Sequence, residues 1–441
     1  MRLQPMAMTH RIEPFAGLLY DVGRVGVMSQ VVAPPYDLID KSRQDALYTR
    51  SLYNVVRLEL NRDPDRYASA ARTLGEWLTA GVLKCAPRPA IYLYSQFFEI
   101  EGRPRRRDGL IVRIHLEEFS AGRILPHERT FPAAKQDRLE LLTALDTNVS
   151  PIFGLYAGAH PALARITAEL ATREPALEVT DDLGIRNQLR PIEDEAAIAT
   201  IQRELESPRI FIADGHHRYE TALEYRRRRR AAEGDPSGAR PYDYTMMTLV
   251  ADDDPGLVIL PTYRVARRLE PETIESFDRR AAPLFAVEEF SSPEAMRAAL
   301  AKAGQGAIAV ALGGERVKLR LLRLKDPRAM ADAMPGAPQA VRRLDVSVLH
   351  ALVLEAIFGI TPEQVKAEGL IEYTIDAPGA LGSVSSGSAS GAFLMNPPTM
   401  GDVEAVSEAG AVMPEKSTYF YPKLLTGLVL NRLDDAAPAK A

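Results

Sequence analysis

Hydrophobic and polar residues follow two different periods along the chain. In the segment Asp65–Ala80 the apolar residues recur every three or four positions, which predicts a helix that ends at Gly81. Elsewhere, short runs rich in β-branched and aromatic residues predict strands. The two patterns are interspersed over the whole length, and we therefore expect an α+β protein.

Two strand-like runs, Ala90–Glu99 and Gly109–Glu117, flank a segment with four arginines. This pattern predicts a β-hairpin whose charged tip, Glu101–Asp108, lies in solvent. Farther on, Gly379–Gly391 is rich in glycine and serine, and its composition predicts a flexible loop.

The pattern along the chain also predicts four regions. Residues 1–235 form a core that contains a candidate phosphate-binding turn. Residues 236–365 form an inserted or second α/β region, and residues 366–433 form a C-terminal segment that returns to the site. Residues 434–441 form a disordered tail.

The change from apolar to polar residues at Asp214 is the most informative local feature. The run Arg209–Ala213 predicts a strand, Gly215 permits a tight turn, and a helix is expected from Tyr219 onward. Unpaired backbone N–H groups at a helix start bind anions, and Arg218 adds a fork of donors that suits phosphate or carboxylate. The segment therefore predicts an anion-binding strand-to-helix turn, with Gly215 and Arg218 holding phosphate.

The same turn carries groups that could perform chemistry. His216 and His217 can act as acid, base or metal ligand near neutral pH, and Asp214 can act as a base or hold Mg²⁺. The alternative is that Asp214 caps the helix and the histidines lie on the surface. No cofactor is evident from the sequence, and the identity of any metal is left open.

Two further segments combine charges with other polar groups. His127, Glu128 and Arg129 place an acid and a base beside cations. Glu128 is a candidate base or Mg²⁺ ligand, and His127 and Arg129 are candidate phosphate-binding residues, but a solvated helix entrance explains the segment equally well. The segment Pro414–Lys423 suits a phosphate and a stacked ring, although an amphipathic strand with its lysines outside explains it nearly as well. The candidate ligand-binding residues in it are Lys416, Ser417 and Lys423.

Charge and composition narrow the function classes. The net charge is −5 and the sequence pI is about 5.9, which argues against a protein that coats nucleic acid. The five consecutive arginines at Arg226–Arg230 fall late in a predicted helix, where a solvated face is the expected role and a nucleic-acid patch is the alternative.

Cys85 is the single cysteine, so neither an intramolecular disulfide nor a cysteine-based zinc site can form. The chain shows no signal-peptide pattern and no apolar run of membrane-spanning length, and we expect a cytoplasmic protein without a membrane partner.

Five separated motifs, in order, resemble those of a bacterial and archaeal family, the domain-of-unknown-function 1015 family. This resemblance covers nearly the whole chain and brings no established activity. The motifs are Ala33–Asp37, Pro126–Thr130, Asn148–Phe153, Ile212–Tyr219 and Met413–Lys423.

A second resemblance concerns the turn itself. Gly215–Tyr219 is similar to the Gly-x-x-Arg-Tyr-x-Ala element of the ParB/sulfiredoxin superfamily, although Ala222 stands one place later than the pattern requires. The resemblance implies a ParB/sulfiredoxin-like core with additional α/β elements, and a nucleotide phosphate at the helix start. Members include nucleotide-hydrolysing partition proteins, sulfiredoxin and free-serine kinases. His216 stands where sulfiredoxin has its catalytic cysteine, which argues against that chemistry.

These observations lead to two hypotheses. The first is an enzyme that acts on a nucleotide or small phosphorylated metabolite by phosphoryl transfer or phosphate hydrolysis: a small-molecule kinase, a phosphatase or a nucleotide hydrolase. Its substrate could be related to serine or phosphoserine. The second is a nucleotide-sensing or nucleic-acid-associated binding protein that uses the same turn without turnover. The sequence names neither the substrate nor the oligomeric state.

Overall fold

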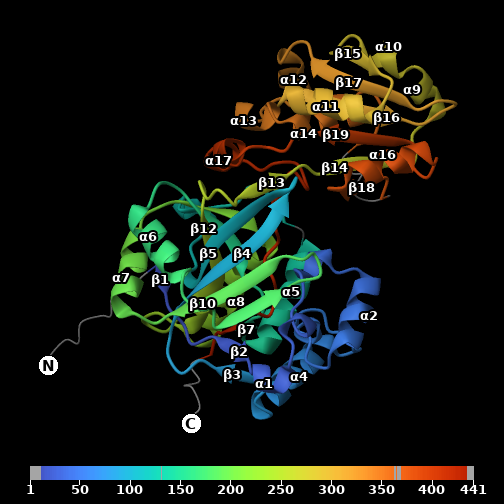
Figure 1. The fold of residues 1–441 in the computed structure, drawn as a ribbon. Coiled ribbons are helices and arrows are strands. Elements are labelled where there is room, and N and C mark those ends of the chain that lie inside the picture. Colours follow the sequence, from blue (N-terminus) through green and yellow to red (C-terminus); the bar gives the residue numbers. More distant parts are fainter. Residues whose placement is uncertain (1–10, 131, 362–363, 365–368, 435–441) are drawn as a thin grey trace. The chain divides into compact units, whose positions relative to one another are not determined.

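The computed structural model describes residues 11–130, 132–361, 364 and 369–434, which form two compact units (Figure 1). Unit 1 contains the described residues up to Pro126, from Thr130 to Leu257 and from Pro422 onward. Unit 2 contains His127–Arg129 and Val258–Tyr421. The chain therefore leaves unit 1 and returns to it for its last described residues. Of the predicted tail, residues 435–441 lie outside the described residues.

Within the described residues, unit 1 is built on a nine-stranded sheet. Its strands are β1 (Ile12–Glu13), β4 (Ile91–Ile100), β5 (Arg103–His115), β6 (Ile124–Leu125), β8 (Ile152–Tyr156), β9 (Leu177–Thr180), β10 (Arg186–Ile192), β11 (Ile210–Asp214) and β12 (Tyr244–Ala251). They follow the order β6-β11-β8-β12-β5-β4-β10-β9, and β1 pairs with β5. β12 follows residue 235, where the sequence predicted a boundary, yet it pairs with β5 and β8 inside this sheet.

Helices α6 (Pro161–Leu170), α7 (Glu195–Glu204) and α8 (His216–Ala232) share one hydrophobic core with this sheet. Helix α5 (Pro132–Leu145) packs against both α8 and α4 (Arg66–Thr79). Shorter elements complete the unit: α1 (Val22–Val25), α2 (Lys41–Arg50), α3 (Val56–Glu59), the pair β2 (Leu18–Tyr20) and β3 (Leu83–Cys85), and the pair β7 (Thr147–Asn148) and β21 (Asn431–Arg432).

Unit 2 has an antiparallel sheet in the order β15-β17-β16-β19-β14-β18. These strands are β14 (Tyr263–Ala266), β15 (Phe285–Phe290), β16 (Ala307–Leu312), β17 (Lys318–Leu324), β18 (Ile371–Thr374) and β19 (Gly391–Met395). Helices α11 (Pro293–Ala303) and α16 (Ala377–Ser385) share a hydrophobic core with it. The other elements are α9 (Pro271–Glu275), α10 (Phe277–Ala281), α12 (Arg328–Ala333), α13 (Gln339–Arg342), α14 (Asp345–Val348), a π-helical turn (Leu349–Glu355), α17 (Met400–Glu408), and the pair β13 (Val258–Leu260) and β20 (Tyr419–Tyr421).

The predicted hairpin forms, and Arg103 and Arg105 are exposed as expected, but the arginines lie on strand β5 and Arg107 is buried. The turn is confined to Glu101 and Gly102, both with positive φ (51° and 73°), as a tight two-residue hairpin requires. β5 therefore starts at Arg103, and its alternation turns Arg107 into the interior. Burial lowers the pKa of Arg107 to about 10, and its guanidinium donates to Gln96 and to the Pro422 carbonyl.

The prediction of a flexible loop at Gly379–Gly391 is wrong for its first half. Asp376 caps α16 by accepting from the N–H of Gly379 at 3.1 Å, and a proline stands in the first turn. Ala377, Ala380, Leu381 and Val384 recur at helical spacing and are buried. Helical periodicity thus outweighs the glycine and serine content.

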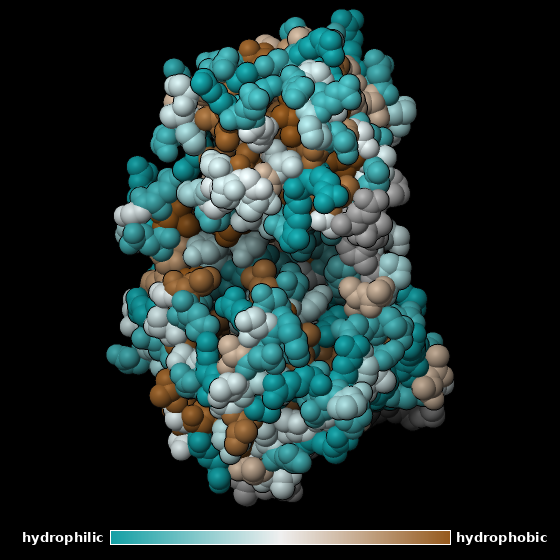
Figure 2. All heavy atoms as spheres, turned by 90° about the vertical axis from the view of Figure 1, so that its right-hand side faces the viewer, coloured by the Kyte–Doolittle hydropathy of each residue, from teal (hydrophilic) through white to brown (hydrophobic). Residues whose placement is uncertain are grey.

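The mixture of helices and strands confirms the α+β prediction, and the ParB/sulfiredoxin-like core stays a prediction. Hydrophilic side chains cover most of the face shown in Figure 2, with apolar side chains in small groups among them. Among the helices of the described residues, none is long and apolar enough to cross a membrane.

Candidate functional site

The strand-to-helix turn at Asp214 forms as predicted. β11 ends at Asp214, Gly215 caps the helix with φ 90° and ψ 30°, and α8 begins at His216. A Cβ on Gly215 would lie 2.8–3.0 Å from the guanidinium of Arg218. Glycine is therefore required for two reasons, the positive φ and the return of Arg218 over the turn.

The side chains around the turn form an ion cluster. Arg218 Nη2 lies 2.6 Å from Asp214 Oδ2, and Lys423 Nζ contacts the other oxygen, Oδ1. Arg218 Nη1 also donates to the carbonyl of Pro151 at 2.5 Å. All three charged side chains are at most 15% exposed, so water screens their attraction weakly. The alternative in which Asp214 caps the helix is wrong, because Gly215 occupies that position and the carboxylate binds two cations instead.

Electrostatics determine the protonation of Asp214. Burial alone would raise the pKa of the carboxyl, but the attraction of Lys423 and Arg218 outweighs it and lowers the pKa below its ordinary value. Asp214 is therefore ionised at neutral pH and is a weak base.

Residues outside the predicted site surround Arg218. Arg138 stacks over Tyr36 with 4.4 Å between the guanidinium and the ring centroid, and it pairs with Glu59 at 3.1 Å. Burial raises the pKa of Tyr36 to about 12, although Arg218 and Arg138 act in the opposite direction. Arg138, Arg218 and Glu59 line a cavity of about 50 Å³, which has room for a few water molecules. The signal that could have found Tyr36 is its place in the Ala33–Asp37 motif.

The two histidines differ in exposure. His216 is buried and His217 is half-buried, both in the first turn of α8. A protonated His216 would lower the pKa of Asp214 further and so favour its ionised form.

Glu220, one turn farther along α8, connects this helix to the start of α5. It accepts hydrogen bonds from Thr130 at 2.8 Å and from Lys135 at 2.7 Å.

The remaining predicted site residues belong to unit 2. His127 is fully buried, and its Nε2 lies 2.9 Å from the Thr418 hydroxyl. Desolvation lowers the pKa of the buried Arg264 to about 10. The carboxylate of Glu128, which is half-buried, acts in the opposite direction. Arg129 is exposed.

The loop before β20 also belongs to unit 2. Lys416 is exposed with a positive φ of 52°, and the buried Ser417 donates to the Pro414 carbonyl at 2.5 Å. Arg264 donates to the carbonyls of Glu415 and Lys416, at 2.9 and 3.1 Å. The structure thus brings Lys423 to the Asp214 turn and places Lys416 and Ser417 in the other unit. A shared site for both groups of residues stays a prediction.

Each arginine of the run Arg226–Arg230 has a partner in the protein. Arg227 and Arg228 pair with Glu224, and Arg226 pairs with Glu118. Arg229 pairs with Asp146 and Glu233, and Arg230 pairs with Asp235 and Asp243. These contacts favour the structural role of the run over a nucleic-acid patch.

In the part of the chain that the structure describes, no group of three or more His, Cys, Asp or Glu side chains is placed so that it could bind a metal ion. Both oxygens of Asp214 are engaged by cations. A Mg²⁺ ion at this turn would need oxygen ligands from a bound phosphate, which is how Mg²⁺ is commonly held. Mg²⁺ therefore stays a prediction.

The fold and the ion cluster define an α+β protein with a buried charge cluster at a strand-to-helix turn. The chain belongs to the family described as "Protein of unknown function (DUF1015)", whose model matches residues 12–347. This match confirms the family that the motifs indicated, and it contains four of the five motifs; Met413–Lys423 lies beyond the matched residues. A comparison with curated proteins gives no match.

Several solved structures are distantly similar. A free serine kinase variant in complex with ADP is 14% identical over 71% of this chain and 87% of that one, with a TM-score of 0.35. A conserved hypothetical protein from Pyrococcus furiosus is 15% identical over 72% and 92%, with a TM-score of 0.34. SbnI with a C-terminal truncation, from Staphylococcus aureus, is 12% identical over 72% and 85%, with a TM-score of 0.33. At these TM-scores the likeness defines neither the fold nor the function of this chain.

Proposed function

We propose that the Asp214 turn binds the phosphate of a nucleotide or small phosphorylated metabolite, and that the protein transfers or hydrolyses that phosphoryl group. The observation that carries the proposal is the surplus charge of the ion cluster. Arg218 and Lys423 supply two positive charges and Asp214 supplies one negative charge, so the cluster keeps one net positive charge. The start of α8 adds the partial positive charge of a helix N-terminus, and together they favour an anion.

An unmet hydrogen-bond donor supports the same conclusion. The Nε of Arg218 is buried, and among the described residues it has no hydrogen-bond partner. A buried donor without an acceptor costs free energy, which a phosphate oxygen or a water in the adjoining cavity would recover.

The proposed chemistry follows the general course of phosphoryl transfer. The hydroxyl oxygen of an acceptor, such as serine, or of water attacks the phosphorus, and a new O–P bond forms as the bond to the leaving oxygen breaks. The hydroxyl proton passes to a base, and cations at the turn offset the charge on the phosphoryl oxygens. Asp214 is a poor choice of base because its pKa is lowered, so His216, which follows it in the same turn, is the candidate base in unit 1. We also propose that the core of the protein has a ParB/sulfiredoxin-like fold.

Ligand binding is tested first, by calorimetry and thermal shift with ATP, ADP, AMP, CTP and phosphoserine. Arg218→Ala should weaken the best ligand about tenfold or more, because two charge-assisted hydrogen bonds are lost. Arg218→Lys keeps the charge without the fork and should fall between wild type and Arg218→Ala. Arg72→Ala is the matched control, since Arg72 is an exposed arginine of unit 1. Unchanged affinity in Arg218→Ala would show that Arg218 is structural.

Binding without turnover is the second candidate, and a specific observation favours it. Both oxygens of Asp214 are occupied by cations, which leaves this carboxylate with no evident catalytic role. ³¹P NMR of the best nucleotide, with and without serine and with and without Mg²⁺, separates the candidates. New phosphorus signals that are lost in Arg218→Ala indicate an enzyme, whereas tight binding with an unchanged spectrum indicates a sensor.

A further inference from the structure

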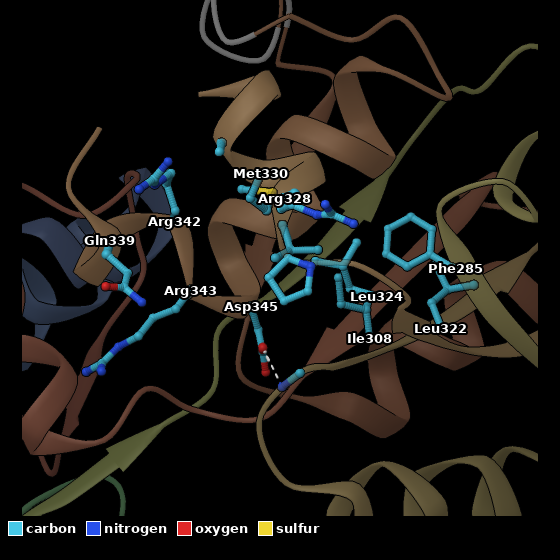
Figure 3. Close-up of a pocket in the computed structure, with 14 residues that line it drawn as sticks. Phe285, Ile308, Leu322, Leu324, Arg328, Met330, Gln339, Arg342, Arg343 and Asp345 are labelled. Atoms are coloured by element: carbon cyan, nitrogen blue, oxygen red, sulfur yellow. Dashed lines mark hydrogen bonds between the residues drawn. The ribbon is translucent and has the colours of Figure 1, made fainter. Parts of the chain in front are cut away.

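The cavity of unit 2 that Figure 3 shows has a volume of about 440 Å³ and an apolar wall. Phe285, Ile308 and Leu322 belong to this wall, and the guanidinium of Arg342 points away from it (Figure 3). The wall thus offers burial to apolar groups. Buried polar side chains converge elsewhere, in unit 1, on the segment with which the chain re-enters that unit.

A row of polar side chains crosses three adjacent strands of the unit 1 sheet (Figure 1). Asn187 on β10, Gln96 on β4 and Arg107 on β5 stand opposite one another in the strand register. Residues that stand opposite each other on neighbouring strands point to the same face of a sheet, so the three side chains lie side by side. Gln96 donates to Asn187 at 3.1 Å and accepts from Arg107. All three residues are at most 1% exposed.

The row holds the backbone of the returning segment. Arg107 donates to the carbonyl of Pro422, and Gln96 donates to the carbonyl of Lys423 at 3.1 Å. Two neighbouring carbonyls of the segment are therefore fixed by two neighbouring side chains of the sheet.

A fourth side chain extends the row along β4. Tyr94 donates to Asn187 at 2.6 Å, and its hydroxyl accepts from the backbone N–H of Leu425 at 3.3 Å. Because Tyr94 stands two positions before Gln96 on the strand, both side chains lie on the same face of the sheet. The returning segment is thus held by hydrogen bonds at three of its backbone groups.

Lys423 connects this row to the candidate phosphate site. Its carbonyl accepts from Gln96, and its ammonium group contacts Oδ1 of Asp214. The guanidinium of Arg107 also lies 4.7 Å from the ring centroid of Phe153, which stands beside Asp214 in the sheet. Side chains that are locked by surrounding hydrogen bonds keep a binding group in place, and here the backbone of the binding group is locked.

The burial of Arg107 costs free energy. Desolvation lowers the pKa of its guanidinium to about 10. Replacement of buried charged groups by well-packed apolar side chains is often neutral or stabilising, so a gain in stability does not explain an arginine at this position. What the guanidinium supplies is a fixed hydrogen bond to the returning segment.

We propose that Arg107 and Gln96 are positioning residues of the phosphate site, which hold the backbone of Pro422 and Lys423 so that the Lys423 ammonium reaches Asp214 and the phosphate. This inference rests on the phosphate-binding function proposed for the Asp214 turn. The competing explanation is that the row only stabilises the sheet, in which case the ion pair with Asp214 alone would keep Lys423 in place.

The position of Lys423 is tested without any ligand, by brief acetylation of the full chain with acetic anhydride and mass spectrometry. The exposed Lys416 is the internal reference. Lys423 is 13% exposed and paired, so in the wild type it should react several-fold more slowly than Lys416. Arg107→Met should raise the rate at Lys423 several-fold, and Arg107→Lys, which keeps a donor, should restore part of the protection. Arg103→Met is the matched control at an exposed position of β5 and should change nothing.

The coupling between Arg107 and Lys423 is tested by calorimetric titration with inorganic phosphate. Arg107→Met and Lys423→Met should each weaken phosphate binding about tenfold. The double variant should bind phosphate no more weakly than Lys423→Met does, because Arg107 acts only through Lys423. A merely structural role of Arg107 would lower the melting temperature and leave this coupling absent.

The proposal is wrong if acetylation of Lys423 is unchanged in Arg107→Met, or if the effects of the two substitutions on phosphate binding add. Gln96→Met replaces Arg107→Met in both measurements if the latter does not fold, and failure of both to fold would assign the row to the fold alone and overturn the proposal. A wild type that binds no phosphate, together with the expected acetylation changes, would refute the phosphate-binding function but not the placement of Lys423 by the row.

Discussion

Replacing Asp214 by Asn removes the carboxylate that Arg218 and Lys423 share. The variant keeps the size of the side chain but leaves two cations, 12% and 13% exposed, without their counter-charge. Removing one partner of a buried ion pair costs about 3–5 kcal/mol, because the remaining charge stays desolvated. We expect the free energy of unfolding of unit 1 to fall by about this amount.

Anions should stabilise the same variant more than they stabilise the wild type. With Asp214 neutralised, the net charge of the cluster rises from one positive charge to two, so inorganic phosphate should stabilise Asp214→Asn more than it stabilises the wild type. Urea unfolding followed by tryptophan fluorescence measures both effects. Trp77, the single tryptophan of the chain, is buried in α4 and reports on unit 1.

Asp65→Asn is the control, since Asp65 pairs with Arg72 at an exposed position, where solvent screens the attraction and the pair should add little stability. The wild type should also lose the contribution of Asp214 on acidification. The folded-state pKa of Asp214 is lowered, so this stability is present above the unfolded pKa of about 3.9 and is lost as pH falls through the folded value. An Asp214→Asn variant as stable as the wild type, or equal stabilisation of both by phosphate, would refute the reasoning.

Four further outcomes are expected. Gly215→Ala should destabilise unit 1 by about 1–3 kcal/mol in urea unfolding. Alanine is strained at φ 90°, and its Cβ would displace Arg218. Unchanged stability would contradict this explanation of the turn. The contribution of Asp345 to the stability of unit 2 should fall by up to about 3 kcal/mol as pH rises from about 4 to 7, because the pKa of folded Asp345, about 6, exceeds the unfolded value and the folded state binds more protons. Denaturation at several pH values should therefore show the loss of this contribution in Asp345→Asn when it is compared with the wild type. Arg230→Ser should lower the melting temperature, as it removes the contact to the buried Asp243, and leave any DNA or RNA binding in a gel-shift assay unaltered. Leu381→Asp should unfold unit 2, as seen by circular dichroism, whereas a flexible loop would tolerate it.

Local patterns were sufficient where adjacent residues decide the structure. The apolar run before Asp214 and the glycine after it predicted the strand, the turn and the helix, because backbone conformation there depends on the residues themselves. Composition was a poorer guide. The serines and glycines of α16 suggested a loop, but its buried apolar positions follow a helical period and its cap is Asp376. The arginines before Gly109 suggested a solvated tip. Arg103 and Arg105 are exposed, but the two-residue turn places all four arginines on strand β5, where Arg107 is buried.

The sequence by itself determined the mixed α and β architecture, the family motifs and the strand-to-helix turn at Asp214, whose anion binding stays a prediction. The partners of that turn were decided by tertiary structure. Lys423 lies 209 positions from Asp214, and Tyr36 and Arg138 come from other segments of unit 1. Likewise, the burial that leaves Asp345 Oδ2 without a donor among the described residues depends on how the sheet and the short helices of unit 2 pack. Hydrogen bonds and ion pairs form between groups that folding brings together, and the spacing of residues along a chain does not specify which distant groups those are.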